Sequence, residues 1–384
     1  MIISYGGKNC WLFKDWFEIN FQINKNVPAE FGFQDKRVVP IMCFEGPNAS
    51  GKTCALKILT FIADFCKNSF SYAPEREVPY DTFFHNRDES EFNMTFSLSS
   101  DIETEYTYEV VFLDMKVKRE KLTSRRKRTK TTLISRFDDS FKEINIPGVG
   151  NTKIQIRDNV SCISTLYQYG VKAIYPLIEF FGSIISNISY IGRKNDHLLS
   201  DPASFYYKNP EMLEKVKVEM KKMDTGISNI KIEDFTNQEG KKVYYSVIYN
   251  ETEQGEKPLN YFEMSTGSKL LYSRLNDIFN TIENGGVLVF DELDCHLHSS
   301  LVPMILKYFL DPEINTKHSQ LVFTSHDSSL LDIAKKYRTY IFEKNKGEGI
   351  CYRIDELPAN MTSRNDRSLE QVYKSGILGG LPNA

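Results

Sequence analysis

The sequence Gly46-Pro47-Asn48-Ala49-Ser50-Gly51-Lys52-Thr53 matches the pattern G-x-x-x-x-G-K-[ST] of phosphate-binding loops. Such a loop needs glycines because its backbone N–H groups converge on phosphate oxygens, in a conformation that a Cβ atom would obstruct. We expect Lys52 to reach the β- and γ-phosphates of a nucleotide and the hydroxyl of Thr53 to hold Mg²⁺. The alternative is a glycine turn without a ligand.

The residues on either side of this loop support nucleotide binding. Residues 38–44 are apolar and predict a buried strand, whereas residues 54–66 predict a helix. A helix that follows the loop directs its positive N-terminal end at the bound phosphates. Strand, loop and helix therefore occur in the order that a P-loop nucleotide site requires.

Composition sets the broad class of the protein. The chain has 384 residues, of which 41% are hydrophobic, enough for two lobes or one large α/β domain with insertions. A net charge of −3 does not favour nucleic acid as a partner of the whole molecule. Seven cysteines without a C-x-x-C pair, and no signal peptide, indicate a reducing cytoplasm. Residues 171–191 are apolar but contain Glu179, so we expect a core helix there and no membrane partner.

The hydrophobic pattern predicts strands before helices along the first half of the chain. Alternation at 17–23, 92–98 and 106–112 is typical of half-buried strands, which indicates a hairpin or small antiparallel sheet after the P-loop helix. From about residue 165 to 224 the pattern becomes helical, with apolar side chains at helical spacing at Leu213, Val216, Met220 and Met223. These methionines are interpreted as core.

The second half of the chain predicts a largely parallel sheet. Residues 243–247 form one strand pattern, and a helix follows Leu270. Three short apolar runs at 287–290, 321–323 and 339–342 each adjoin a loop or helix signal, as buried parallel strands do.

Residues 116–130 are strongly basic, and two interpretations stay open. The run is either a solvated hairpin face or loop, or a patch for nucleic acid or an acidic partner. No aromatic residue lies within it, which weakens the case for stacking on single strands. The basic residues are Lys116, Lys118, Arg119, Lys121, Arg125, Arg126, Lys127, Arg128 and Lys130.

Three segments downstream complete a catalytic pattern. An apolar strand at 287–290 ends in Asp291, expected to bind Mg²⁺, and Glu292, expected to polarise the attacking water. Ser265 and Gly267 form a Ser-x-Gly turn before a helix, which is an anion site. A strand at 321–323 leads to His326. Phosphate loop, Ser-x-Gly turn, strand with two acids and strand with histidine follow the order used by ABC-type ATPases.

Other histidines and acids near this pattern have plainer interpretations. His326 could be a satisfied polar residue at a strand end, although its place in the series favours a role at the γ-phosphate. His296 and His298 could suggest a metal site, but no second cluster of ligands accompanies them in the sequence. Asp294 lies where ABC-type enzymes carry the loop that joins their two active sites.

These motifs resemble those of the compact ABC-type ATPases of bacterial phage-defence and abortive-infection systems, namely AbiLi-like and RloA-like proteins and the AriA ATPase of the PARIS system. The resemblance covers most of the chain. It rests on residues 44–53, 224–230, 265–268, 291–298 and 324–327, and on a tail comprising 364–370, Tyr373, Gly376, Gly379, Gly380 and Pro382. It implies a multimeric ATPase in which two copies sandwich two ATP molecules, working with a separate effector that is often a nuclease.

Two departures from related families limit the alternatives. Met264 and Thr266 differ from the LSGGQ signature of transporter domains, which disfavours transport. The glutamine of the usual Q-loop is not identified, and the turn at 84–88 is its expected place. The competing functions are a DNA-repair ATPase of the RecF or SMC type and an ATP-dependent assembly scaffold with incidental turnover.

The sequence therefore predicts an α/β P-loop NTPase of ABC-ATPase type with two lobes and a mixed sheet. Residues 1–150 and 286–384 are assigned to a nucleotide-binding lobe with an antiparallel subdomain, and residues 151–285 to a helical signature lobe. The expected activity is hydrolysis of ATP to ADP and phosphate in an antiphage sensor or regulator. The expected ligands are ATP and Mg²⁺, and the expected partners are a second copy in a homodimer or higher oligomer and a nuclease or toxin.

Overall fold

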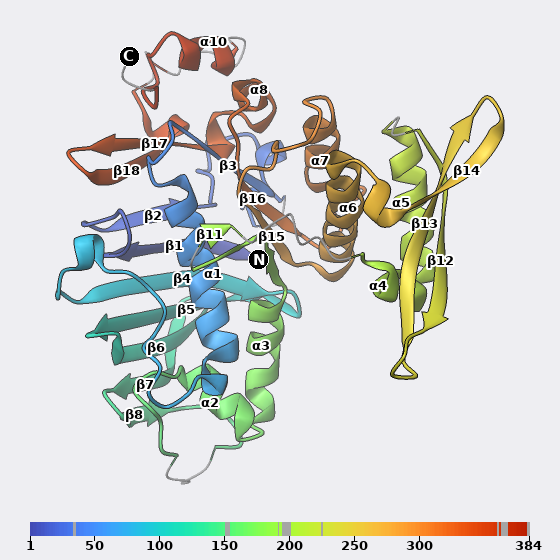
Figure 1. Ribbon diagram of the computed structural model, residues 1–384. Coiled ribbons are helices and arrows are strands. Elements are labelled where there is room, and N and C mark those ends of the chain that lie inside the picture. The colour runs from blue at the N-terminus through green and yellow to red at the C-terminus, as the bar shows by residue number, and fades with distance from the viewer. Residues whose placement is uncertain are drawn as a thin grey trace.

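The computed structural model describes residues 1–33, 36–149, 154–190, 192–193, 201–223, 226–358, 361 and 368–381. The chain forms a mixed six-stranded sheet, an antiparallel seven-stranded sheet and a smaller three-stranded sheet, with helices between and beside them (Figure 1). A two-stranded pair, β10 (Ile188–Ser189) with β11 (Gly192–Arg193), completes the sheets of the described residues.

The six-stranded sheet carries the P-loop. Its order is β18-β17-β3-β16-β15-β9, and every neighbouring pair is parallel except β17 with β18. The three central strands are buried along their whole length, which explains their continuous apolar sequences. The strands are β3 (Ile41–Glu45), β9 (Ile184–Ser186), β15 (Val287–Phe290), β16 (Gln320–Thr324), β17 (Thr339–Asn345) and β18 (Glu348–Arg353).

The seven-stranded sheet is entirely antiparallel and lies on the other side of helix α1 (Lys52–Asn68) from most of the parallel strands (Figure 1). Its order is β2-β1-β4-β5-β6-β7-β8. The strands are β1 (Ile2–Lys8), β2 (Phe17–Asn20), β4 (Ser90–Leu98), β5 (Asp101–Leu113), β6 (Lys116–Arg126), β7 (Thr129–Phe137) and β8 (Ser140–Ile144).

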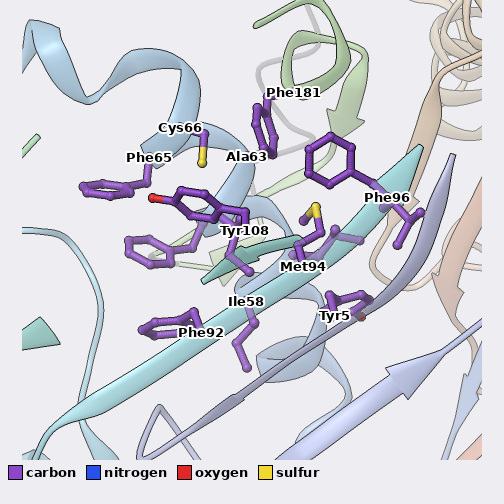
Figure 2. Close-up of a cluster of buried hydrophobic side chains, with 14 of the residues drawn as sticks. Tyr5, Ile58, Ala63, Phe65, Cys66, Phe92, Met94, Phe96, Tyr108 and Phe181 are labelled. Atoms are coloured by element: carbon purple, nitrogen blue, oxygen red, sulfur yellow. The ribbon is translucent and has the colours of Figure 1, made fainter. Parts of the chain in front are cut away.

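Helix α1 is held in place by an aromatic core (Figure 2). Ile58, Ala63 and Phe65 on its apolar face meet side chains of β1, β4 and β5, among them Tyr5, Phe92, Met94, Phe96 and Tyr108. Helices α2 (Cys162–Gln168) and α3 (Tyr175–Gly182) close the cluster, and Phe96 stacks on Phe180 with ring centroids 4.2 Å apart. Because each buried aromatic side chain contributes about 1.5–3 kcal/mol, this core fixes the start of α1, and thus the P-loop, against the sheets.

A second core organises the part of the chain that carries Ser265. Helices α5 (Pro210–Lys222) and α6 (Thr266–Asn284) pack together, and α7 (Leu301–Leu310) shares their core. The three-stranded sheet lies beyond α6, away from the six-stranded sheet (Figure 1). Helices α4 (Ala203–Lys208) and α5 cover the face of the three-stranded sheet that points toward α6. That sheet comprises β12 (Ile227–Thr236), β13 (Lys242–Thr252) and β14 (Gly255–Asn260).

The tail packs beside β17 of the six-stranded sheet. Helix α10 (Leu369–Lys374) packs on α8 (Leu331–Ala334), and a small buried cluster joins both to β17. The hydroxyl of Tyr352 donates to the carbonyl of Leu378, and the N–H of Gly380 donates to Glu343.

The structure confirms an α/β fold with a mixed sheet in which the P-loop sequence joins β3 to α1. The predicted strands at 92–98, 106–112, 243–247, 287–290, 321–323 and 339–342 and the helix at 54–66 are present. The strand predicted at 38–44 begins only at Ile41, after Pro40.

The prediction of one core helix over residues 171–191 was wrong. Helix α3 ends at Gly182, and Ile184 and Ile185 pair with β15 at the edge of the six-stranded sheet. β-Branched side chains suit a pleated strand, so the apolar run divides between two elements. Among the described residues, no helix combines the length and apolar character needed to span a membrane.

We propose another boundary between the lobes than the one expected from the sequence. The segment 151–285 assigned to the helical lobe includes α2 and α3, which pack on α1, and β9, which joins the six-stranded sheet. We therefore propose that the second lobe begins with α4. Of the motifs that carry the family resemblance, residues 224–225, 364–367 and 382 lie outside the described residues.

Candidate functional site: the phosphate loop and its acids

The phosphate loop follows β3 and takes the shape that its glycines permit. Gly46 has a φ of +148°, and a Cβ atom there would lie 2.3 Å from the carbonyl oxygen of Phe342. Gly51, with a φ of +111°, is the N-cap of α1. Both conformations strongly favour glycine, which is why this spacing is readable in the sequence.

Lys52 and Ser50 provide polar atoms at the loop. The Lys52 ammonium donates to the carbonyls of Gly46 at 2.5 Å and Pro47 at 3.0 Å. Burial lowers the pKa of Lys52, although the nearby carboxylates of Glu45 and Asp291 oppose that shift. The Ser50 hydroxyl is buried and has no hydrogen-bond partner among the described residues. A buried orphan hydroxyl beside a lysine fits a loop built to receive phosphate oxygens.

Thr53 and Asp291 come together from elements far apart in the sequence. The Thr53 hydroxyl donates to the Asp291 carboxylate, with Oγ1 to Oδ distances of 3.0 and 3.1 Å. The Thr324 hydroxyl lies 2.8 Å from Asp291 Oδ1. Asn187 fixes the backbone of Asp291 through two hydrogen bonds, of 2.8 and 3.0 Å. Hydroxyl and carboxylate oxygens are the donors that Mg²⁺ prefers, so this pair fits the predicted ion.

Glu292 and His326 face each other beside this pair. Glu292 Oε1 lies 3.8 Å from His326 Nε2, and the two side chains are 38% and 44% exposed. The backbone of Glu292 has a φ of +53°, a left-handed conformation that is rare for glutamate, and its N–H donates to the Thr324 hydroxyl at 2.7 Å. The arrangement gives a carboxylate that water can reach and an imidazole next to it.

These groups line one cavity of about 420 Å³. A second cavity of about 1070 Å³ adjoins it and shares Asn48, His326 and Lys344. The first cavity is lined by Leu12, Asn48, Ala49, Ser50, Gly51, Lys52, Thr53, Cys54, Asp291, Glu292, Thr324, His326 and Lys344. The fold thus collects the P-loop, both acids and the histidine at one place.

The Ser-x-Gly turn lies outside this cavity. The hydroxyl of Ser265 caps α6 by accepting a hydrogen bond from the N–H of Ser268 at 3.1 Å. A Cβ atom added to Gly267 would lie 2.8 Å from the carbonyl oxygen of His296. Neither Ser265 nor Gly267 lines this cavity.

Sequence reasoning missed several residues of the site. Thr324 belongs to the motif at residues 324–327, but the sequence does not show that its hydroxyl forms a hydrogen bond with Asp291. Leu12 and Lys344 line the cavity from distant segments. The turn at 84–88, the expected place of a Q-loop, contains no glutamine and does not line this cavity. Among the described residues, no group of three or more histidine, cysteine or acidic side chains is placed to hold a metal.

Glu45 is a further group that the sequence did not single out. It directly precedes the P-loop, is buried, and its Oε2 has no hydrogen-bond partner among the described residues. Burial raises the pKa of this carboxyl to about 8, opposed mainly by Lys52. Asp294 and Asp327 raise it further. The side chain is therefore expected to be largely protonated near neutral pH.

This raised pKa predicts a pH-dependent stability. Unfolded Glu45 releases its proton above pH 4.5, its ordinary pKa, whereas the folded chain holds this proton up to about pH 8. The part of the free energy of unfolding that comes from this proton is therefore full below pH 4.5 and is lost as the pH rises through about 8. Glu45→Gln should become more stable relative to wild type over this range, and the difference should then level off. Urea unfolding at a series of pH values measures it. Glu103→Gln, at a side chain that is 62% exposed, is the control; a pH-independent effect of Glu45→Gln would contradict the assignment.

Comparison with known protein families gives a match over most of the chain. A family model described as "AAA domain, putative AbiEii toxin, Type IV TA system" matches residues 41–332. No curated protein matches.

Solved structures that resemble the chain share little sequence with it. The SMC head domain from Thermotoga maritima is 13% identical and has a TM-score of 0.45, with 92% of this chain and 98% of that chain covered. An SmcHead bound to the C-winged helix domain of ScpA is 13% identical, with the same coverage and a TM-score of 0.47. CbiO1 from Clostridium perfringens, part of the ABC transporter complex cbiONQ, is 11% identical, with 92% and 90% covered and a TM-score of 0.33.

Proposed function

Because the chain belongs to the family of AAA domains described as putative AbiEii toxins of type IV toxin–antitoxin systems, we propose that it is an ATPase that regulates an antiphage response. Two copies would complete each ATP site, and a separate effector, such as a nuclease, would carry out the response. The observation that carries the ATPase proposal is the cavity in which Lys52, Thr53, Asp291, Glu292 and His326 meet.

The residues of the cavity divide the work of hydrolysis. The loop amides and Lys52 bind the phosphates, and Thr53 with Asp291 would hold Mg²⁺, which neutralises charge on the transferred phosphoryl group. Glu292 takes the proton of the attacking water as general base. His326 stabilises the γ-phosphate. Phosphoryl transfer depends mainly on such positioning and charge stabilisation.

The exposure of Glu292 and His326 supports completion by a second copy. Both side chains are more than one third exposed, whereas efficient hydrolysis needs bulk water to be excluded from the site. Ser265 and Gly267 offer an anion site at the N-terminus of α6, and neither residue lines the nucleotide cavity of its own chain. We place this turn over the γ-phosphate bound by the partner.

Two exposed phenylalanines support the same arrangement. Phe84, 69% exposed, and Phe262, 67% exposed, are the most exposed large apolar side chains of the described residues. Phe262 lies three positions before Ser265, and Phe84 lies beside Gly347, which lines the cavity adjoining the nucleotide site. Exposed apolar side chains are typical of surfaces that a partner covers. Phe262 therefore lies near the Ser265 turn, and Phe84 lies near the cavity that adjoins the P-loop, the two parts that the proposed dimer would bring together.

Two observations test this function. Purified chain should release phosphate from ATP only when Mg²⁺ is present, and Lys52→Ala should abolish nucleotide binding because the phosphates lose their cation. A gene for a nuclease or toxin immediately beside this one would support the antiphage role. Absence of any ATP turnover or ATP binding would contradict the proposal that the chain is an ATPase.

The basic run bears on the competing function, a DNA-repair ATPase. Lys116, Lys118, Arg119 and Arg125 each lie in an ion pair with a carboxylate. The turn between β6 and β7 and the strand ends beside it carry the exposed cations Arg126, Lys127, Arg128 and Lys130. The run is thus an ordered hairpin, and nearly half of its charge is compensated locally.

Because the net charge of the whole chain is −3, we expect the tip of this hairpin to make no phosphate contacts with duplex DNA. Replacing Arg126, Lys127, Arg128 and Lys130 by glutamine should leave DNA affinity and its salt dependence at the wild-type level. A variant with glutamine at Lys116, Lys118, Arg119 and Arg125 is the matched control, measured by fluorescence anisotropy over a salt series. If the turn binds phosphates, the salt slope should instead fall by up to about 3.6 in the first variant, which would favour the DNA-repair function.

A further inference from the structure

A buried arginine links α6 to the segment that follows Glu292. Arg274 is 3% exposed, and its Nη1 donates to the carbonyl oxygens of Leu293 at 2.7 Å and Cys295 at 3.4 Å. Its guanidinium carbon lies 5.4 Å from the ring centroid of Phe290, the last residue of β15 and the one directly before Asp291. A buried cation is costly unless its donors find acceptors, so the two bonds from Nη1 favour one position for the segment 293–296.

A second contact joins the same two elements at the start of α6. The α-carbon of Gly267 approaches His296 so closely that an added Cβ atom would lie 2.8 Å from the His296 carbonyl oxygen. Residues 267 and 274 are seven positions apart and therefore share one face of the helix. The segment 293–296 thus lies along the face of α6 that begins at the Ser265 turn.

The other side of this segment is bonded to the catalytic groups. The N–H of Cys295 donates to the carbonyl of Glu292 at 3.1 Å. Asp294 Oδ2 accepts a hydrogen bond from the N–H of His326 at 3.1 Å. Because Glu292 has a left-handed backbone, its conformation depends on the residues that hold it on either side. A shift of 293–296 would therefore move both Glu292 and His326.

We propose that Arg274 is a positioning residue that sets the orientation of Glu292 and His326 according to the position of α6. The Ser265 turn lies at the N-terminus of this helix, so the same helix that contacts the partner's nucleotide adjusts the base and the histidine of its own chain. This inference rests on the proposed function in that it takes Glu292 as the base. It goes beyond that function because it couples the Ser265 turn to Glu292 and His326 of the same chain.

The kinetic test compares two buried arginines. Arg274→Met should lower kcat by about 10- to 100-fold while KM and the Kd for ATP change less than about threefold, since a displaced catalytic group affects turnover and not the phosphate loop. Arg274→Lys keeps one cationic donor and should recover part of kcat. Arg338→Met is the matched control, because Arg338 is also buried and donates to two backbone carbonyls, of Phe31 and Glu30, at 2.9 and 3.0 Å. An unchanged kcat in Arg274→Met, or an equal loss in Arg338→Met, would overturn the proposal.

Hydrogen exchange tests the inference without any reaction. The N–H groups of Cys295 and Leu297 are bonded within the segment, to the carbonyls of Glu292 and Asp294. In Arg274→Met their exchange should be at least about tenfold faster than in wild type, whereas Arg338→Met should leave it unchanged. Equal exchange in Arg274→Met and wild type would overturn the inference. A wild-type chain that does not hydrolyse ATP would contradict only the proposed function, because this measurement needs no turnover.

Discussion

Replacing Glu292 by glutamine should lower ATP turnover by about two to four orders of magnitude, while ATP binding is retained. Glutamine keeps the size of the side chain and its place beside His326, but it cannot accept the proton of the attacking water. The phosphate loop, Thr53 and Asp291 are untouched, so the affinity for ATP should stay near wild type. Phosphate release measures turnover, and fluorescence of a labelled nucleotide measures binding.

Lys52→Ala gives the contrasting result in the same assays. It should abolish binding itself, because Lys52 is the cation of the phosphate loop. The two variants thus separate binding from chemistry. Turnover at the wild-type rate in Glu292→Gln would rule out Glu292 as the base.

Gly267→Asp should abolish turnover although Gly267 lies outside the nucleotide cavity of its own chain. An aspartate here would place negative charge beside the γ-phosphate bound by the partner. The structure adds a second reason, because a Cβ atom at this position would lie 2.8 Å from the carbonyl oxygen of His296. Binding of ATP to the P-loop should be unaffected.

Gly267→Ala separates these two effects. It adds the Cβ atom without the charge, so it should keep part of the turnover that aspartate removes. If Gly267→Asp hydrolyses ATP at the wild-type rate, the Ser265 turn takes no part in the site.

The local parts of the site could be predicted from the sequence because local rules govern them. The P-loop is readable since Gly46 and Gly51 adopt positive φ angles that other residues avoid. Asp291 is readable because an apolar strand ends directly before it. The parallel strands β15, β16 and β17 follow from short apolar runs that are buried on both faces.

The remaining parts depend on contacts between distant segments. The bonds from Thr324 to Asp291 and from Arg274 to Leu293 join different elements, and no sequence spacing encodes them. The division of residues 171–191 into a helix and an edge strand depends on pairing with β15, which the apolar pattern alone does not reveal. Glu45 shows the same limit, because its raised pKa follows from burial in the folded chain.

The composite site is the central claim, and mixing two inactive chains tests it most directly. Lys52→Ala lacks a working phosphate loop. Ser265→Asp keeps a capping side chain on α6 but places negative charge at the Ser-x-Gly turn, so this chain lacks a working turn. In a mixed dimer, the intact loop of one chain meets the intact turn of the other. An equimolar, fully exchanged mixture should therefore regain about a quarter of the wild-type rate of phosphate release, since half of the dimers are mixed and each has one competent site. A mixture no more active than the two variants measured separately would contradict the account.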